Sequence, residues 1–284
     1  MQRTLSRSEV MPLLATAQGD LIDFTVGFAK CVPPVNPVEV TLAGSGTLVC
    51  AGGVRAILTA EHVLSHLPDS GNVGLIAPTR QQGHHPPVII NMEHVRKIPI
   101  ARRGADESQG PDIGLLLLSP AHWSLLPTGK PFFNLSKRRD LMLNAPHAPQ
   151  RGIWVICGMV GEWTNNPPQK HRLPEQRQGF HGLCMPVLLK RERQQAVFDY
   201  VCVQVGKNEA DKAPESFGGC SGGGVWHLVI YEKEDGSLVV GESLLSGVIF
   251  YEWYWEDGRA TIVCHGRRSI YGKVVDTLEG FAAH

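Results

Sequence analysis

The sequence has no surplus of charge of either sign, because Lys and Arg number 27, Asp and Glu number 27, and the formal net charge is zero. Proteins that bind nucleic acid usually carry an excess of basic residues gathered on one face. The basic clusters here, such as Arg102-Arg103 and Arg267-Arg268, are short and typical of solvated loop surface. We therefore expect no nucleic-acid partner.

Long apolar runs are also lacking. No segment approaches the roughly 18 apolar residues of a membrane span, and residues 1–20 hold no apolar stretch typical of a signal peptide. The seven cysteines are an odd number, and no two have the Cys-x-x-Cys spacing of a structural zinc site. These absences predict a reduced, cytoplasmic protein with free thiols and without a membrane, metal or cofactor partner.

Short apolar segments rich in Val, Ile, Leu and aromatic residues are abundant, and Gly, Pro and Asn separate them. Such segments favour antiparallel strands in a sandwich or barrel over alternating strands and helices. Helical periodicity is confined to two short stretches, residues 60–67 and 272–281. The expected strands cover residues 47–50, 56–59, 88–91, 114–118, 153–160, 196–205, 225–231, 238–240, 244–251 and 260–263.

Two of these strands are bordered by residues capable of acid–base chemistry. His62 follows one strand in the segment Thr59-Ala60-Glu61-His62, and Asp112 opens the segment Asp112-Ile113-Gly114-Leu115-Leu116. A buried carboxylate is costly unless it is hydrogen-bonded, so Asp112 is expected to have a partner. Taken singly, each residue is also compatible with a structural role, as a satisfied histidine or a strand-capping aspartate.

A third segment, Gly218-Gly219-Cys220-Ser221-Gly222-Gly223-Gly224, sets a serine among five glycines just before a strand. Glycines let backbone N–H groups converge beside the serine oxygen, which is the geometry of an oxyanion hole. A phosphate-binding loop is also rich in glycine, but it ends in Gly-Lys-Ser/Thr and continues as a helix. Neither feature occurs here, so a nucleotide site is the weaker interpretation.

In the order His, Asp, Ser, the three segments resemble those of the trypsin- and chymotrypsin-like serine peptidases, including the bacterial HtrA-like branch. Residues 59–62 are similar to the T-A-A-H segment of that family, residues 112–116 to D-I-A-L-L, and residues 219–223 to G-D-S-G-G. The resemblance covers about residues 40–275.

The resemblance implies an all-β fold of two six-stranded antiparallel β-barrels, the chymotrypsin fold, with a short C-terminal helix. Residues 1–39 would lead into the fold. Residues 40–135 would form the first barrel and carry His62 and Asp112. Residues 136–284 would form the second barrel and carry Ser221 with the specificity pocket.

A catalytic triad is implied in turn. Ser221 would attack the scissile carbonyl of a peptide or protein substrate, His62 would act as the general base, and Asp112 would orient the His62 ring. The backbone N–H groups of Gly219 and Ser221 would form the oxyanion hole. The expected activity is that of a serine endopeptidase working through an acyl-enzyme.

Four further residues are expected to bind substrate. Phe250 and Glu252 lie in a segment similar to the family's G-I-V-S-W-G strand, and Ser269 lies in one similar to its P-G-V-Y-T-K-V strand. Glu215 stands six residues before Ser221, where trypsin has an aspartate at the base of its pocket. An acid there would favour cleavage after Arg or Lys, whereas Glu252 would either add acidity or block the pocket mouth.

Several positions depart from the family pattern. Cys220 replaces the aspartate that pairs with a newly cut N-terminus in secreted members, and no I-V-G-G-like activation segment occurs. Activation by cleavage is therefore not expected, and a regulatory protein partner is. Cys220 is an alternative nucleophile, although Ser221 has the two following glycines. The other alternative is a catalytically silent binding or scaffold module with a trypsin-like fold.

Overall fold

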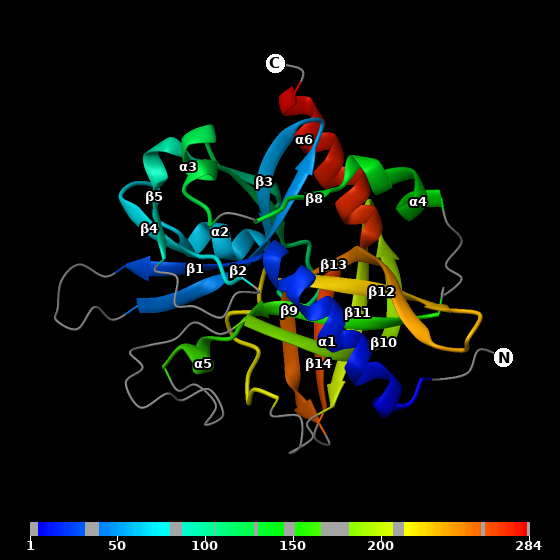
Figure 1. Cartoon of the computed structure of the whole chain (residues 1–284). Coiled ribbons are helices and arrows are strands. Elements are labelled where there is room, and N and C mark those ends of the chain that lie inside the picture. Colours follow the sequence, from blue (N-terminus) through cyan, green and yellow to red (C-terminus); the bar gives the residue numbers. More distant parts are fainter. Residues whose placement is uncertain are drawn as a thin grey trace.

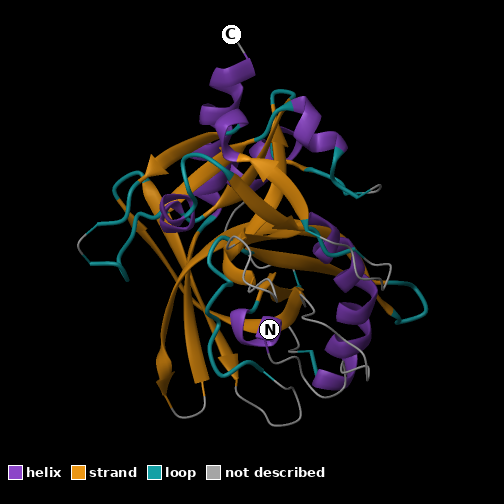
Figure 2. Cartoon of the chain, turned by 90° about the vertical axis from the view of Figure 1, so that its left-hand side faces the viewer, coloured by secondary structure: helices purple, strands orange, loops and turns teal. Residues whose placement is uncertain are grey.

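Two β-sheets, with helices packed around them, form most of this chain in its computed structural model (Figures 1 and 2). The structure describes residues 5–31, 40–79, 87–104, 106–127, 130–144, 151–165, 182–206, 213–256 and 259–282. Among the helices of these residues, none combines the length and apolarity needed to cross a bilayer. The cysteines with described side chains are free thiols: Cys50, Cys157, Cys184, Cys202, Cys220 and Cys264.

Strands make up most of the elements, and helices separate some of them along the chain. The strands are β1 (Thr25–Cys31), β2 (Val40–Ala51), β3 (Val54–Thr59), β4 (Asn72–Ile76), β5 (Val88–Asn91), β6 (Arg96–Ala101), β7 (Ile113–Leu117), β8 (Phe133–Asn134), β9 (Gly152–Met159), β10 (Gly182–Gln195), β11 (Phe198–Gly206), β12 (Gly224–Glu232), β13 (Leu238–Glu256) and β14 (Arg259–His265). The helices are α1 (Arg7–Phe24), α2 (Glu61–His66), α3 (Pro120–Ser124), α4 (Arg139–Asn144), α5 (Gly161–Asn165) and α6 (Val275–Ala282), with 3₁₀ turns η1 (Met92–His94) and η2 (Ser136–Arg138) and the π-helical segment η5 (Ser269–Val274).

The first sheet is open. Its strands follow the order β5-β4-β1-β2-β3-β7-β6, all antiparallel, and the two-residue strand β8 pairs in parallel with β2. Gly52 and Gly53, both with positive φ, make the tight turn that joins β2 to β3. β7 lies between β3 and β6, and its run of Ile and Leu is buried on both faces. The expectation of two closed barrels is therefore not confirmed.

The second sheet closes into a ring of six antiparallel strands in the order β10-β11-β14-β13-β12-β9. β9 pairs with β10 on one side and with β12 on the other, which completes the ring. The expected strands in this half of the chain are thus present, and the two expected over residues 238–240 and 244–251 are one strand, β13. β10 was not expected from the sequence. A ring of paired strands leaves few free edges along its length.

The N-terminal segment is part of the fold rather than a lead-in. The Glu9 carboxylate accepts hydrogen bonds from the Ser6 amide and hydroxyl at the start of α1. The buried residues of α1, among them Leu13, Ala17 and Leu21, pack on the core. β1 then lies between β2 and β4 in the first sheet. The first sheet therefore begins well before residue 40.

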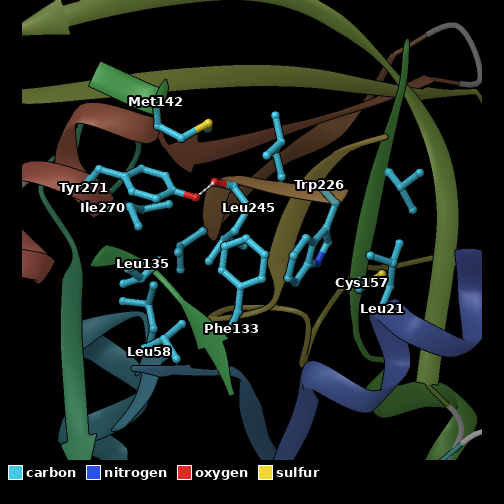
Figure 3. Close-up of a cluster of buried hydrophobic side chains, with 14 of the residues drawn as sticks. Leu21, Leu58, Phe133, Leu135, Met142, Cys157, Trp226, Leu245, Ile270 and Tyr271 are labelled. Carbon is cyan, nitrogen blue, oxygen red and sulfur yellow. Dashed lines mark hydrogen bonds between the residues drawn. The ribbon is translucent and has the colours of Figure 1, made fainter. Parts of the chain in front are cut away.

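One hydrophobic cluster joins the two sheets and the terminal helices (Figure 3). At its centre the rings of Phe133, from the first sheet, and Trp226, from the second, pack edge to face at 5.0 Å. The buried Tyr271 hydroxyl donates to the Leu245 carbonyl at 2.9 Å, so the C-terminal segment is tied to β13. Because both sheets pack on this one cluster, it fixes their relative position at the common boundary.

Residues 268–274 were expected to form a strand, and this prediction is wrong. The chain turns at Gly266 and continues as η5 and then α6. Hydrogen bonds to Asp199 explain the turn, because the Arg268 and Ser269 amides both donate to the Asp199 carboxylate at 2.9 and 2.7 Å. The strand that completes the ring is β14, which ends three residues earlier than the expected segment begins.

Candidate active site

The strand pairing of the first sheet brings His62 and Asp112 together. β3 and β7 are neighbours, with Thr59 opposite Gly114. The chain leaves β3 at Thr59 and enters α2, which places His62 three residues beyond the strand. It enters β7 from Asp112, two residues before Gly114, at the same end of the pair. Two residues 50 positions apart in sequence thus meet through one ladder of backbone hydrogen bonds.

Both carboxylate oxygens of Asp112 contact His62. Oδ2 lies 2.6 Å from the ring Nδ1, and Oδ1 accepts a hydrogen bond from the His62 amide at 2.9 Å. The Asp112 side chain is fully buried, whereas that of His62 is 15% exposed. An ionised carboxylate can only accept, so the Nδ1 atom carries the proton and the opposite nitrogen, Nε2, is left as a base.

The charge on Asp112 is maintained in spite of its burial. Burial raises the pKa of the Asp112 carboxyl, but the hydrogen bonds from His62 and the nearby Arg103 guanidinium more than offset this, and the pKa is lowered. Arg103 Nε lies 3.6 Å from Asp112 Oδ2. The same guanidinium pairs with Glu107 at 2.9 Å and lies over the Tyr251 ring at 5.9 Å.

A second histidine, His265, contacts the backbone of Asp112. The Asp112 amide donates to His265 Nε2 at 2.9 Å, and this ring is fully buried among Phe198, Tyr200 and Phe250. Burial lowers the pKa of His265 to about 3, so its ring is neutral and can accept this hydrogen bond. His265, the last residue of β14 in the second sheet, therefore fixes the backbone of Asp112, which precedes β7 in the first sheet.

The Ser221 loop is anchored on the first sheet. The Ser221 carbonyl accepts from the Ser45 amide at 2.8 Å, and the Ser45 carbonyl accepts from the Thr59 hydroxyl at 2.6 Å. The Gly222 amide donates to Ile249 of β13 at 2.7 Å. Gly222 has a φ of +88°, and a Cβ atom there would lie 2.0 Å from Thr59 Oγ1. Only glycine allows this loop to approach the end of β3 so closely.

The same contacts put Ser221 near His62. A Cβ atom on Gly44 would lie 2.6 Å from Val63 Cγ2 and 3.2 Å from the Ser221 carbonyl oxygen. The backbone of Gly44 thus lies between Ser221 and Val63, the residue that follows His62. The structure brings the segments of all three expected catalytic residues to one place at the boundary of the two sheets.

Cys220 and Ser221 have opposite environments. Cys220 is fully buried in the cluster inside the second sheet, with Ile156, Val225 and Ile249, whereas Ser221 is half-buried at the boundary. Burial, followed by the charges of Glu252 and Glu162, raises the pKa of the Cys220 thiol. A buried thiol held in its protonated form is a poor nucleophile. The inward position of Cys220 therefore favours Ser221 as the reactive residue.

The backbone amides of Gly219 and Ser221, expected to form the oxyanion hole, differ from the neighbouring carbonyls in their hydrogen bonding. The Gly219 carbonyl accepts from the Ser45 hydroxyl at 2.6 Å, and the same hydroxyl accepts from the Met159 amide at 2.7 Å. Within the described part of the chain, the amides of Gly219 and Ser221 donate to no other protein group. Gly219 has a φ of +93°, a conformation that favours glycine. Two unused donors on a braced loop are suited to hold an anionic oxygen.

Glutamates hold the loop that leads to Ser221 from two sides. The Glu162 carboxylate, on α5, accepts from the amides of Glu215 at 3.0 Å and Ser216 at 3.3 Å. The Glu252 carboxylate, on β13, accepts from the Phe217 amide at 3.0 Å and the Ser216 hydroxyl at 3.2 Å. The Glu215 side chain is exposed, and its backbone rather than its carboxylate is held by Glu162.

Two residues expected to bind substrate have buried side chains instead. Phe250 is 1% exposed and packs on Tyr200 and His265 in the core. Ser269 is fully buried, and its hydroxyl donates to Asp199 Oδ1 at 2.7 Å at the start of η5. Neither side chain is open to a substrate. Phe250 lies in a strand as the resemblance implied, whereas Ser269 begins the helical segment η5, and the resemblance did not indicate that either side chain would be buried.

Four contributors to the site were missed in the sequence: Ser45, Arg103, Glu162 and His265. Arg103 was assigned to solvated surface, since a basic pair in a loop carries no signal of a buried ion pair. Ser45 stands between two glycines, which is a weak indication of close packing. Ser45, Glu162 and His265 each act through a partner more than 50 residues away in the sequence. Arg103 pairs with Asp112, which is nine residues further along.

The chain matches no protein-family model, and no curated protein matches it in sequence.

Proposed function

We propose that this chain is a serine endopeptidase with the chymotrypsin fold, in which Ser221, His62 and Asp112 form the catalytic triad. The observation that carries the proposal is the pair of contacts between Asp112 and His62, at the boundary to which the braced, glycine-lined Ser221 loop is also anchored. A buried carboxylate that orients an imidazole next to a hydroxyl is the arrangement used for acyl transfer.

The proposed reaction has two halves. His62 Nε2 takes the Ser221 hydroxyl proton as Oγ attacks the scissile carbonyl, and the imidazolium then gives that proton to the leaving amine. A water molecule, deprotonated by His62, next attacks the acyl-enzyme and releases the acid and free Ser221. Asp112 stays ionised throughout and stabilises the imidazolium, in keeping with its lowered pKa.

The developing oxyanion is assigned to the amides of Gly219 and Ser221. A donor of this kind is worth about 3 to 4 kcal/mol in the transition state when it is rigidly placed. Rigidity here comes from Ser45, which holds the Gly219 carbonyl, and from Glu162 and Glu252, which hold the preceding loop. These contacts supply order without a newly cut N-terminus, which accords with Cys220 in place of an aspartate.

The decisive test is labelling by a fluorophosphonate, which forms a phosphorus–oxygen bond with an activated serine and loses fluoride. We expect the purified full chain to be labelled on Ser221, with the site located by mass spectrometry. Ser221→Ala should abolish labelling, and His62→Ala should slow it at least a hundredfold, because the base is lost. Cys220→Ala should keep it.

Three outcomes would count against the proposal. Labelling that survives in Ser221→Ala but not in Cys220→Ala would make the thiol the nucleophile. Labelling spread over surface residues would mean that no serine is activated. A folded wild type that shows no labelling would favour the alternative of a catalytically silent binding module. Circular dichroism of each variant separates loss of chemistry from loss of fold.

A further inference from the structure

The Glu252 side chain spans the space between two segments that flank Ser221. It starts on β13, three residues beyond Ile249, whose carbonyl and amide bond with Gly222 and Gly223. It ends on the loop before Ser221, where it accepts hydrogen bonds from the Phe217 amide and the Ser216 hydroxyl. The carboxylate is thus a bridge from strand to loop, and the side chain is half-buried.

This bridge lies where a substrate side chain would go, if the proposed function holds. A carbonyl carbon attacked by Ser221, with its oxygen at the amides of Gly219 and Ser221, belongs to the residue just before the cut. That residue sits over the Ser221 loop. Its side chain then enters the space between residues 216–218 and the part of β13 that follows Ile249, which is the space that Glu252 crosses.

We infer that Glu252 closes this subsite, so that the enzyme cleaves after small residues such as Gly, Ala or Ser and excludes large or basic side chains there. The inference rests on the proposed function and is an alternative to the expected preference for Arg or Lys. A basic preference needs a carboxylate directed at the substrate. Here Glu252 is directed at Ser216 and Phe217, and Glu215 is exposed.

The bridge is held in place by more than its own two hydrogen bonds. Glu162 binds the amides of Glu215 and Ser216 from the opposite side of the loop. The groups of the loop that donate to Glu252 are therefore held in position. Phe217 is buried among apolar side chains of the second sheet and anchors the amide that Glu252 binds. Opening the subsite would break these contacts and leave a half-buried carboxylate without its donors.

The test is a set of internally quenched peptides that differ only in the residue before one bond, namely Gly, Ala, Ser, Leu, Phe, Lys or Arg. The enzyme is the full chain, and its concentration is set by fluorophosphonate titration of Ser221. For the wild type we expect kcat/KM for Ala to exceed that for Phe and Lys at least a hundredfold. In Glu252→Gly, the Phe-to-Ala ratio should rise at least tenfold.

Two further variants separate shape from charge. Glu252→Gln keeps the length of the side chain and an accepting oxygen, so it should still exclude Phe. Glu242→Gly, on the same strand but exposed, should leave the ratio as in the wild type. Ratios measured within one preparation do not depend on the folded fraction.

Distinct results overturn the inference and the proposed function. A labelled wild type that cleaves best after Lys, Arg or Phe overturns the closed subsite alone, as does a Glu252→Gly variant with an unchanged Phe-to-Ala ratio. A wild type that is neither labelled nor active on any peptide overturns the proposed function and this inference with it.

Discussion

At the scale of single residues, the candidate site depends on the protonation states of two buried groups, the Asp112 carboxyl and the His265 ring. Asp112 is buried and charged because His62 and Arg103 neutralise it. His265 is buried and neutral because removal from water outweighs the nearby charge of Asp112, and its Nδ1 has no hydrogen-bond partner among the described residues. Burial disfavours the charged form of both groups, and only Asp112 has partners close enough to outweigh it.

A pH-dependent contribution to stability follows from His265. The folded chain takes up this proton only near pH 3, whereas the unfolded chain takes it up below its ordinary pKa of 6.5. Between these values the unfolded state binds more protons, so the free energy of unfolding falls as the pH is lowered. Urea denaturation at pH 7 and pH 5 should show His265→Gln losing about 2 kcal/mol less than the wild type over this range.

The glutamine variant keeps an acceptor for the Asp112 amide, which makes it the matched comparison for titration alone. His265→Leu removes the acceptor as well and should cost about 1 to 3 kcal/mol at pH 7, because a buried N–H group is left unpaired. An unchanged pH slope in His265→Gln would show that another group dominates this range.

At the scale of elements, β2 holds the Ser221 loop. Ser45 is fully buried and makes four contacts there: its hydroxyl bonds to Gly219 and Met159, its amide to Ser221, and its carbonyl to Thr59. One residue of the first sheet therefore contacts β3, β9 and the loop before β12. The order of the amides proposed to form the oxyanion hole thus depends on a strand that carries none of the residues proposed for the triad.

Replacing Ser45 by alanine should reduce catalysis more than binding. The Gly219 carbonyl and the Met159 amide would each lose a buried partner, so we expect a loss of about 1 to 3 kcal/mol in the free energy of unfolding. The loosened loop should lower kcat at least tenfold, with a smaller change in KM. Steady-state kinetics and urea denaturation measure the two effects.

Ser246→Ala is the control for a lost buried hydroxyl. The Ser246 hydroxyl bonds to the Leu244 carbonyl on its own strand at 3.1 Å, and among the described residues it makes no hydrogen bond to the Ser221 loop. Its removal should lower stability without lowering kcat. Equal kcat values in the two variants would contradict a bracing role for Ser45.

At the scale of the whole molecule, the site exists only where the two sheets meet. His62 and Asp112 come from the first sheet, whereas Ser221 and His265 belong to the second. Gly222 is a point of close approach, since a Cβ atom there would lie 2.0 Å from Thr59 Oγ1 and 2.1 Å from the Ser45 carbonyl. Regulation by a partner protein stays a prediction from the sequence.

Alanine at Gly222 should therefore force the sheets apart at this point. We expect Gly222→Ala to lower the free energy of unfolding by more than 3 kcal/mol, or to prevent folding, because the contacts are with backbone and a buried hydroxyl. Gly236→Ala is the matched control, since Gly236 also has a positive φ, of +80°, but open space around it. It should cost only the backbone strain, about 1 to 2 kcal/mol. Similar losses in both, measured by denaturation, would refute a steric role for Gly222.

The sequence by itself determined the strand-rich architecture, most strand positions and the residues of the candidate site that stand in local motifs. Alternating apolar segments and turn glycines are properties of near neighbours, so they can be interpreted without knowing the fold. The positions of His62, Asp112 and Ser221 at strand ends followed from such local patterns. The helix α1 was missed because its apolar residues are interrupted by Pro12, Gln18 and Gly19.

Only the tertiary structure decided which distant groups surround those residues. The Asp112–His265 contact joins residues 153 positions apart, and the openness of the first sheet depends on how its edge strands β5 and β6 are placed. It also decided that Phe250 is buried and that Glu252 bridges to Phe217. The physical reason is that burial and hydrogen-bond partners are set by how whole sheets wrap around a shared core, which short sequence patterns do not encode.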